Sequence, residues 1–267
     1  MIEITDADDQ RVDDFRDLSA ADRRPDRPGG RGLVIGEGTV VIGRLLNSAY
    51  PVRALLGVPR RIEQLGAELA GLNAPVYITS AEVMATVVGF HLNRGVLAVA
   101  DRAEQPDPST LVTRSRLLAV LEGIGDHENL GSIFRNAAAL GVDGVLLGPG
   151  CSDPLYRRSV RVSMGHVLRV PFASLPDLAT GFGLLRAHGF RTLALTPRPT
   201  ATRLAELDPA VLGGRIAVLL GSEGPGLTED ALSGADEQVR IPMAKDVDSL
   251  NVATAAAVVF HALGRSE

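Results

Sequence analysis

The stretch LLAVLEGIGDHENLGSIFRNAAALGVDGVLL, residues 117–147, contains a strand, a helix and a second strand in succession. Residues 117–121 and 144–147 are short apolar runs of strand length, and residues 130–140 carry apolar side chains at helical spacing. Two strands joined through a helix pair in parallel, because the helix carries the chain back to the end of the sheet at which the first strand began. This segment therefore predicts a parallel sheet with helices on its faces.

The alternation extends in both directions along the chain. Towards the C-terminus we expect helices over 177–188 and 250–263, with strands at 192–195, 216–220 and 239–241. Towards the N-terminus we expect strands at 32–35, 52–57, 75–78 and 95–100, with helices over 39–46, 60–69 and 81–88. The predicted parts are an acidic leader (1–28, loose or a short peripheral helix), a small α/β domain (29–101), a polar linker (102–113) and a larger α/β domain (114–267).

Composition favours a globular cytoplasmic protein. Apolar residues make up 45% of the chain and charged residues 22%, as in ordinary soluble domains. No apolar run approaches the roughly 20 residues that cross a bilayer, and the acidic N-terminus lacks the pattern of a secretory signal. With Cys151 the only cysteine and the five histidines without ligand spacing, we expect no disulfide and no metal.

Charge by itself is undecided about nucleic acid. The net charge is −5, and residues 1–28 contribute most of it with nine acids and five arginines. Lys245 is the sole lysine, and arginine is the better phosphate ligand. A compositional bias of the source genome explains the same ratio equally well, so charge neither supports nor excludes RNA.

Three loops at predicted strand ends carry the polar residues of interest, because ligands of such sheets collect at the carboxyl ends of the strands. In the first loop, Asn129 could cap the following helix, Gly131 permits close approach of a ligand, and Arg135 follows about two turns into the helix. A capped structural helix with one solvated arginine fits this segment as well.

The second loop, LGSEGPGL at 220–227, packs three glycines around Glu223. Backbone groups would face a ligand there, although the loop is no P-loop because no Gly-Lys-Ser/Thr follows. A plain surface turn is the alternative. In the third loop, IPMAKDVDSLN at 241–251, Ser249 stands where it could cap the closing helix. A buried, capped helix would explain that segment on its own.

Together the three loops resemble the signature motifs of the SpoU/TrmH group of RNA 2′-O-ribose methyltransferases, in the SPOUT superfamily. The matching residues are Asn129, Gly131 and Arg135; then Gly221, Glu223 and Gly224; then Ile241–Met243 and Ser249–Asn251. The resemblance covers residues 116–267 closely. Residues 32–100 more loosely resemble the L30e-like RNA-binding domain that often precedes this catalytic domain, through 32–36 and His91 with 95–98.

The resemblance implies an α/β knot, with a deep C-terminal trefoil knot, and S-adenosylmethionine (SAM) as cofactor. It implies that the cofactor is held largely by backbone, at Leu195, Thr196, Gly221, Gly224, Ile241, Met243 and Leu250. It also implies catalytic roles for Arg135, Asn129, Glu223, Ser249 and Asn251. Because arginine is a poor base, we expect Arg135 to grip a phosphate and orient the ribose hydroxyl, with Glu223 paired to Arg135 or Asn129.

The resemblance further implies a homodimer whose second subunit completes the RNA site. The closing helix 250–263 is a candidate interface, although a core role fits its small apolar residues as well. Arg157, Arg158 and Arg161 form a candidate RNA contact near the active loops, or a solvated helical face. His127 and Lys245 depart from the commonest family pattern, where proline and glycine are frequent, and concern loop shape or substrate.

Two other functions compete. A catalytically inactive RNA-binding protein of the same fold would keep the architecture, but the intact Arg135, Glu223, Ser249 and Asn251 argue against it. A nucleotide-dependent oxidoreductase would need a glycine fingerprint, and the nearest imitation, at 36–41, lacks its third glycine. We favour ribosomal over transfer RNA as substrate, on the L30e-like resemblance alone.

Overall fold

The computed structural model describes residues 1–18, 32–208 and 214–264. They form two compact units: Met1–Glu104 with Leu155–Arg169, and Gln105–Pro154 with Val170–Glu267. No helix within the described ranges is long and apolar enough to span a bilayer.

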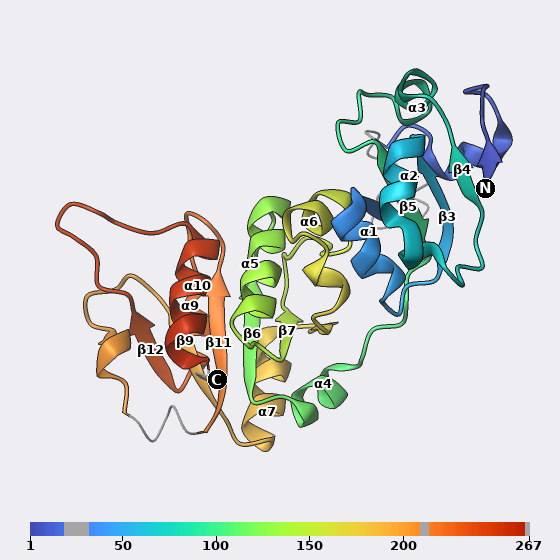
Figure 1. Ribbon diagram of the computed structural model, residues 1–267. Helices are drawn as coiled ribbons and strands as arrows, with labels where there is room; N and C mark the ends of the chain where they lie inside the picture. The colour runs from blue at the N-terminus through green and yellow to red at the C-terminus, as the bar shows by residue number, and fades with distance from the viewer. Residues whose placement is uncertain (19–31, 209–213, 265–267) are drawn as a thin grey trace. The chain divides into compact units, whose positions relative to one another are not determined.

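The first unit is a mixed sheet with helices on both faces (Figure 1). Its elements are β1 (Ile2–Glu3), η1 (Gln10–Phe15), β2 (Val34–Glu37), α1 (Thr39–Leu46), β3 (Val52–Gly57), α2 (Pro59–Leu65), η3 (Gly66–Leu69), β4 (Val76–Ile78), α3 (Ala81–Val88), β5 (Val96–Ala100), α6 (Arg157–Val162) and η4 (His166–Leu168). The strand order is β1-β4-β3-β5-β2, and β5 runs antiparallel to both of its neighbours. The strands and helices predicted for 32–100 are therefore present, with shifted ends.

The N-terminal segment is part of this unit's core and not a loose leader. β1 pairs in parallel with β4, and Val12, Phe15 and Leu18 pack with α3 and the sheet in one buried cluster. Apolar residues at 12, 15 and 18 repeat at the three-residue spacing of a 3₁₀ turn, which is why η1 lays one face on the sheet. The rest of the predicted leader, from residue 19, lies outside the described residues.

The second unit is the parallel sheet that residues 117–147 predict. Its elements are α4 (Pro108–Arg114), β6 (Leu117–Glu122), α5 (His127–Ala139), β7 (Gly144–Leu147), β8 (Phe172–Ser174), α7 (Leu178–Ala187), β9 (Phe190–Leu195), β10 (Thr202–Arg203), η5 (Leu204–Glu206), β11 (Arg215–Gly221), α9 (Glu229–Gly234), β12 (Glu237–Arg240) and α10 (Val252–Leu263). The order is β10-β12-β9-β11-β6-β7-β8, and every described pairing is parallel. The predicted α/β class with a mostly parallel sheet is thus confirmed.

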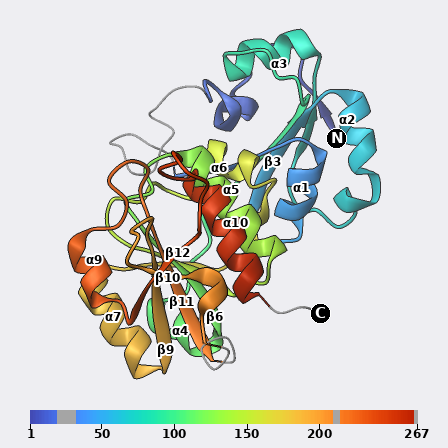
Figure 2. The ribbon, with the colours of Figure 1, turned by 90° about the vertical axis from the view of Figure 1, so that its left-hand side faces the viewer.

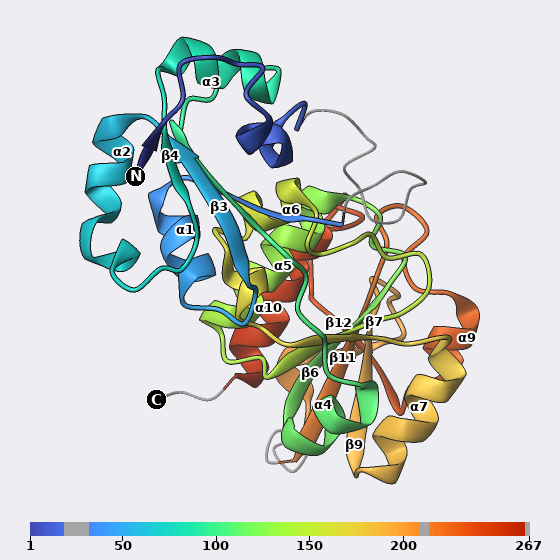
Figure 3. The same ribbon diagram turned by 90° about the vertical axis from the view of Figure 1, so that its right-hand side faces the viewer.

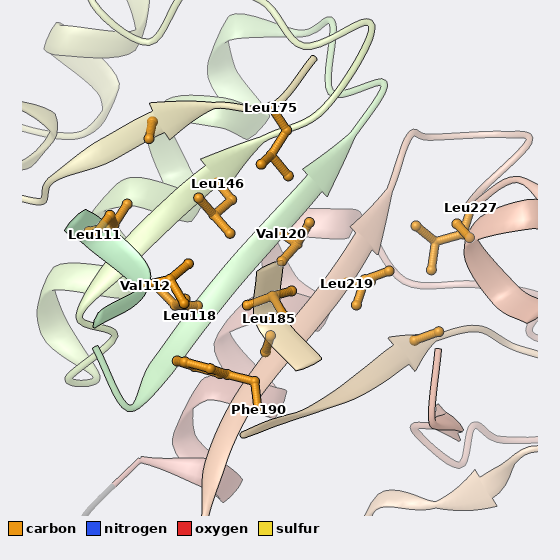
Figure 4. Packing of buried hydrophobic residues seen from close by; sticks show 14 of the residues in the cluster. Leu111, Val112, Leu118, Val120, Leu146, Leu175, Leu185, Phe190, Leu219 and Leu227 are labelled. Carbon is orange, nitrogen blue, oxygen red and sulfur yellow. The ribbon is translucent and has the colours of Figure 1, made fainter. Parts of the chain in front are cut away.

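Two helical layers cover this sheet, because its strands are apolar on both faces. Alternate residues such as Leu118 and Val120 pack with α4, α7 and α9 (Figure 4). α5 and α10 lie against each other on the other face, where the Asn136 amide donates to the Ala253 carbonyl at 2.8 Å (Figures 2 and 3). The small residues of α10 allow this close approach.

The predicted linker is wrong in its second half. Residues 108–114 form α4. Asp107 caps its N-terminus by accepting a hydrogen bond from the Thr110 amide at 3.0 Å. Leu111 and Val112 are buried in the core of the second unit. The Arg215 guanidinium donates to the carbonyls of Thr113 and Ser115, so the helix is held at the start of the sheet. Proline at N1 after an aspartate was the overlooked helix signal.

Candidate active site

A cavity of about 350 Å³ opens at the carboxyl ends of β9, β11 and β12, within the size range of small-molecule sites. It is lined by residues from 195–197, 220–226 and 241–255. All seven residues predicted to hold the cofactor line it, namely Leu195, Thr196, Gly221, Gly224, Ile241, Met243 and Leu250. Glu223, Ser249 and Asn251 also line it. The structure therefore brings together three segments that are far apart in the sequence.

The loop after β11 folds back tightly on its own strand. A bridge joins Ser222 to Gly226, and the Gly226 amide donates to the Ser222 carbonyl at 3.1 Å. A Cβ on Gly221 would lie 2.2 Å from the Leu227 amide nitrogen, so no side chain fits there. Gly224 has a φ of +87°, a conformation that glycine adopts readily. The glycines thus leave backbone groups at the cavity wall.

One side chain joins all three loops. The Asn251 amide nitrogen donates to Asn129 Oδ1 and to Glu223 Oε1, both at 2.7 Å. Its carbonyl oxygen accepts from the backbone amides of Ala253 and Thr254 at 3.0 and 3.1 Å. An asparagine side chain has two donor hydrogens and one acceptor oxygen, and this one uses them all. Asn251 therefore fixes Asn129 and Glu223 relative to the start of α10.

Two capping predictions are corrected here. Asn251, and not Ser249, caps α10, and Ser249 is an exposed residue of the cavity lining. Asp126, and not Asn129, caps α5, accepting from the amides of Glu128 and Asn129 at 2.8 and 2.9 Å. Asn129 lies in the first turn of the helix and is 9% exposed, and its side chain accepts from Asn251.

A smaller cavity of about 140 Å³ adjoins the first and shares Ser222, Glu223 and Val252 with it. Its other wall is the loop after β6, residues 123–126, together with Asn129. Glu223 therefore lines both cavities and Asn129 lines the smaller one, an arrangement that suits a site where two ligands meet.

Arg135 is not among the residues that line either cavity. It is exposed on α5, and we find no hydrogen bond or ion pair to it from the described part of the chain. The predicted pairing of Glu223 with Arg135 is wrong: the donor that reaches Glu223 is Asn251. The Asn129 side chain meets the same amide and does not itself donate to Glu223.

The arginines of α6 do not belong to this unit. Arg157 is half-buried in the first unit, with Nη1 3.5 Å from Glu37 Oε2 and its guanidinium 4.8 Å from the centre of the Phe90 ring. Burial lowers the pKa of Arg157, against the opposing effect of Glu37. Arg158 and Arg161 are exposed on the same helix. The prediction that these arginines belong to the catalytic domain is therefore wrong, because residues 155–169 belong to the first unit.

Sequence reasoning missed several residues at the site. Pro197, Ser222, Val252 and Ala255 line the larger cavity, and Glu122 accepts from the Thr228 amide and hydroxyl, both at 2.9 Å. Glu122 ends β6 and Thr228 caps α9. A carboxylate directly after a buried strand was the available signal for this bond between the loops.

Two other chemistries find little support at the site. Across the described residues, no three His, Cys, Asp or Glu side chains gather in a way that could hold a metal ion. The Cys151 thiol lies 3.4 Å from the Leu121 carbonyl, and burial raises its pKa. A thiol with a raised pKa is a poor nucleophile at neutral pH.

The family model of the SpoU rRNA Methylase family matches residues 116–261, which include every residue predicted for the site. Over nearly the whole chain, a protein of Mycobacterium tuberculosis described as an uncharacterized tRNA/rRNA methyltransferase is 56% identical. That match spans 264 residues, 99% of this chain and 92% of the relative.

Solved structures show the same fold. The AdoMet-bound rRNA methyltransferase from Sinorhizobium meliloti superposes with a TM-score of 0.81 at 23% identity, covering 98% of this chain and 96% of that one. The SpoU methyltransferase AviRb from Streptomyces viridochromogenes, in complex with AdoMet, gives 0.76 at 22% identity and covers 95% and 96%. Both matches extend over both units of the chain.

Proposed function

The chain belongs to the SpoU rRNA Methylase family, and on this basis we propose that it transfers a methyl group from SAM to a ribose 2′-hydroxyl of RNA. Ribosomal RNA is the favoured substrate over transfer RNA, and the cytoplasm is the proposed location. The observation that carries the proposal is the joining of three motif loops at one cavity through the Asn251 side chain.

The cavity suits SAM in size and in chemistry. Apolar side chains of Leu195, Ile241 and Leu250 can cover an adenine ring, and the glycines of 221–226 leave backbone groups to bond its polar edge. Bound there, SAM would supply an electrophilic methyl group. The same residues would exclude water from one side of the reacting pair.

A single methyl group at Gly221 tests this use of the cavity. We expect Gly221→Ala to weaken SAM binding by about a hundredfold or more, because the clash is with backbone and the loop must move to relieve it. Isothermal titration calorimetry measures the affinity. Gly183→Ala is the control: that glycine, in α7, has nothing within 4 Å of an added Cβ, so binding should stay unchanged. Equal SAM affinity in both variants would contradict this use of the loop.

In the proposed reaction the ribose of the target nucleotide enters beside Asn129 and Glu223, and Arg135 of a second copy of the chain binds the adjoining phosphate. Glu223 is an acceptor held by Asn251, so it can receive a hydrogen bond from the 2′-hydroxyl and orient its oxygen towards the methyl group. Positioning of this kind supplies much of the acceleration when the nucleophile is weak. Ser249 is exposed at the cavity wall, and we assign it a contact with the substrate.

The position of Arg135 supports a dimer as the active form. It lies six residues after Asn129 on α5, about 120° round the helix, and so faces away from its own cavity's polar residues. A second copy could bring its Arg135 to this cavity. Within the described part of the second unit, the exposed large hydrophobic residues are Val247, Leu250 and Val258. Their gathering on and before α10 supports this helix as the interface.

The remaining parts of the proposal follow from the family resemblance. We propose that 29–101 is an L30e-like RNA-binding domain and 114–267 a SPOUT domain with a trefoil knot. In the structure α6 packs in the first unit, so the family-model region contributes one helix to the unit expected to dock RNA.

Nucleoside mass spectrometry of ribosomal and transfer RNA, from cells with and without this gene, tests the function. We expect one 2′-O-methylnucleoside to disappear from ribosomal RNA and to return with the wild-type gene. Loss from the transfer RNA pool would reassign the substrate. If neither pool changes and the purified chain still binds RNA, it acts as the catalytically inactive RNA-binding protein.

A further inference from the structure

Arg61, Arg94 and Arg157 come from three separate segments and lie near one end of the first unit's sheet. Arg94 packs over Gly38, where an added Cβ would lie 3.1 Å from Arg94 Cδ. Arg61 packs over Gly95 in the same way, 3.3 Å from its Cγ. The Gly38 amide donates to the Val96 carbonyl at 3.0 Å, so these two glycines, and the two arginines over them, are neighbours.

The third segment is α6. Arg157 is anchored by Glu37, the residue before Gly38, and by the face of Phe90. Arg161 follows one turn later on the same helix and is exposed. The ion pair with Glu37 compensates the charge of Arg157 and joins the first turn of α6 to the end of β2. We call Arg61, Arg94, Arg157 and Arg161 the arginine ridge.

Three of the four ridge arginines, Arg61, Arg94 and Arg161, differ from several other arginines of their unit in having no carboxylate partner among the described residues. Arg11 pairs with Asp9, and Arg53 with Asp14 and Asp101. By contrast, no carboxylate among the described residues pairs with Arg94 or Arg161, and Arg61 donates to the neutral Gln64 side chain at 2.8 Å. Three guanidinium charges are therefore left to an outside partner.

We propose that the arginine ridge binds the phosphate backbone of the RNA substrate, with Arg61, Arg94 and Arg161 as contacts and Arg157 as the positioning residue beneath them. This inference rests on the proposed function. Guanidinium forks match phosphate oxygens and bind them without regard to sequence. An RNA bound there would contact both the N-terminal part of the first unit and α6, the helix that the SpoU family model includes.

Fluorescence anisotropy with a labelled mixed-sequence RNA hairpin tests the ridge. We expect Arg94→Gln with Arg161→Gln to weaken binding roughly tenfold and to make the slope of log K against log salt shallower by about 1.5, the effect of two lost phosphate contacts. Glutamine keeps part of each stem and removes the charge. Arg114→Gln with Arg186→Gln, exposed on α4 and α7, removes the same charge from the second unit and should leave both values unchanged.

Equal weakening in the two double variants would overturn the proposal, since net charge alone would then explain it. An unchanged salt slope in the ridge variant would overturn it too. If the ridge variant keeps its RNA affinity but loses binding to phosphatidylserine vesicles, the surface belongs to lipid and the proposal fails. The titrations need no SAM, so a chain that binds RNA through the ridge but transfers no methyl group would refute only the proposed function. Arg157→Gln should give the same RNA defect with an additional fall in melting temperature.

Discussion

Replacing Arg135 by alanine is expected to lower the rate of methyl transfer by about a hundredfold to a thousandfold, the usual cost of losing one hydrogen-bond donor at a transition state. SAM affinity should not change, because Arg135 is outside the residues that line the cavity. Its side chain is exposed and bonds to no described residue, so the fold should be intact. The lower rate of methyl transfer would therefore reflect a changed interaction with the RNA substrate alone.

Single-turnover transfer of a labelled methyl group to the RNA identified by mass spectrometry measures this effect. Arg114→Ala, at an exposed arginine on α4, is the matched control and should react at the wild-type rate. Arg135→Lys keeps the charge but loses the planar fork, so we expect an intermediate rate. Near-normal turnover of Arg135→Ala would show that the residue plays no part in the reaction.

The second large effect is expected at Asn251. Asn251→Asp keeps the oxygen that caps α10 but loses both amide hydrogens, and it sets a carboxylate against Glu223. A lost hydrogen bond to a charged group is worth about 1.5–3 kcal/mol, and the repulsion adds to it. We expect SAM affinity to fall by about ten- to a hundredfold, because the three loops lose their common bond.

A reversed pair provides the control for that experiment. Glu223→Gln with Asn251→Asp restores a donor and an acceptor between the same two positions, and should recover much of the SAM affinity. Calorimetry measures binding, and thermal unfolding shows whether α10 has kept its cap. If the double variant binds no better than Asn251→Asp, the bond between the loops is not what shapes the cavity.

Helix caps show where reasoning from the sequence was limited. Asp126 and Asn129 are both good capping residues three positions apart, as Ser249 and Asn251 are two apart. The local sequence permits either member of each pair. The choice depends on where the preceding loop brings the chain. Here the hydrogen bond between Asn129 and Asn251 requires Asn129 inside α5 and Asn251 at the start of α10.

The arginines of α6 show a second limit. Their spacing predicted an exposed basic helix, and Arg158 and Arg161 are exposed. Their assignment to the catalytic domain relied on sequence proximity. The ion pair between Arg157 and Glu37 joins residues 120 positions apart, and no periodicity within either segment could reveal it.

The sequence by itself determined the parallel α/β class, most of the strands and helices of both units, and many of the residues that line the cavity. These depend on local apolar periodicity and on short motifs, which can be read along the chain. Only the tertiary structure decided the caps, the partner of Glu223, the place of α6 and the solvent-facing position of Arg135. Each of these depends on which distant segments pack together, because a hydrogen bond or an ion pair needs two partners whose separation is set by the fold.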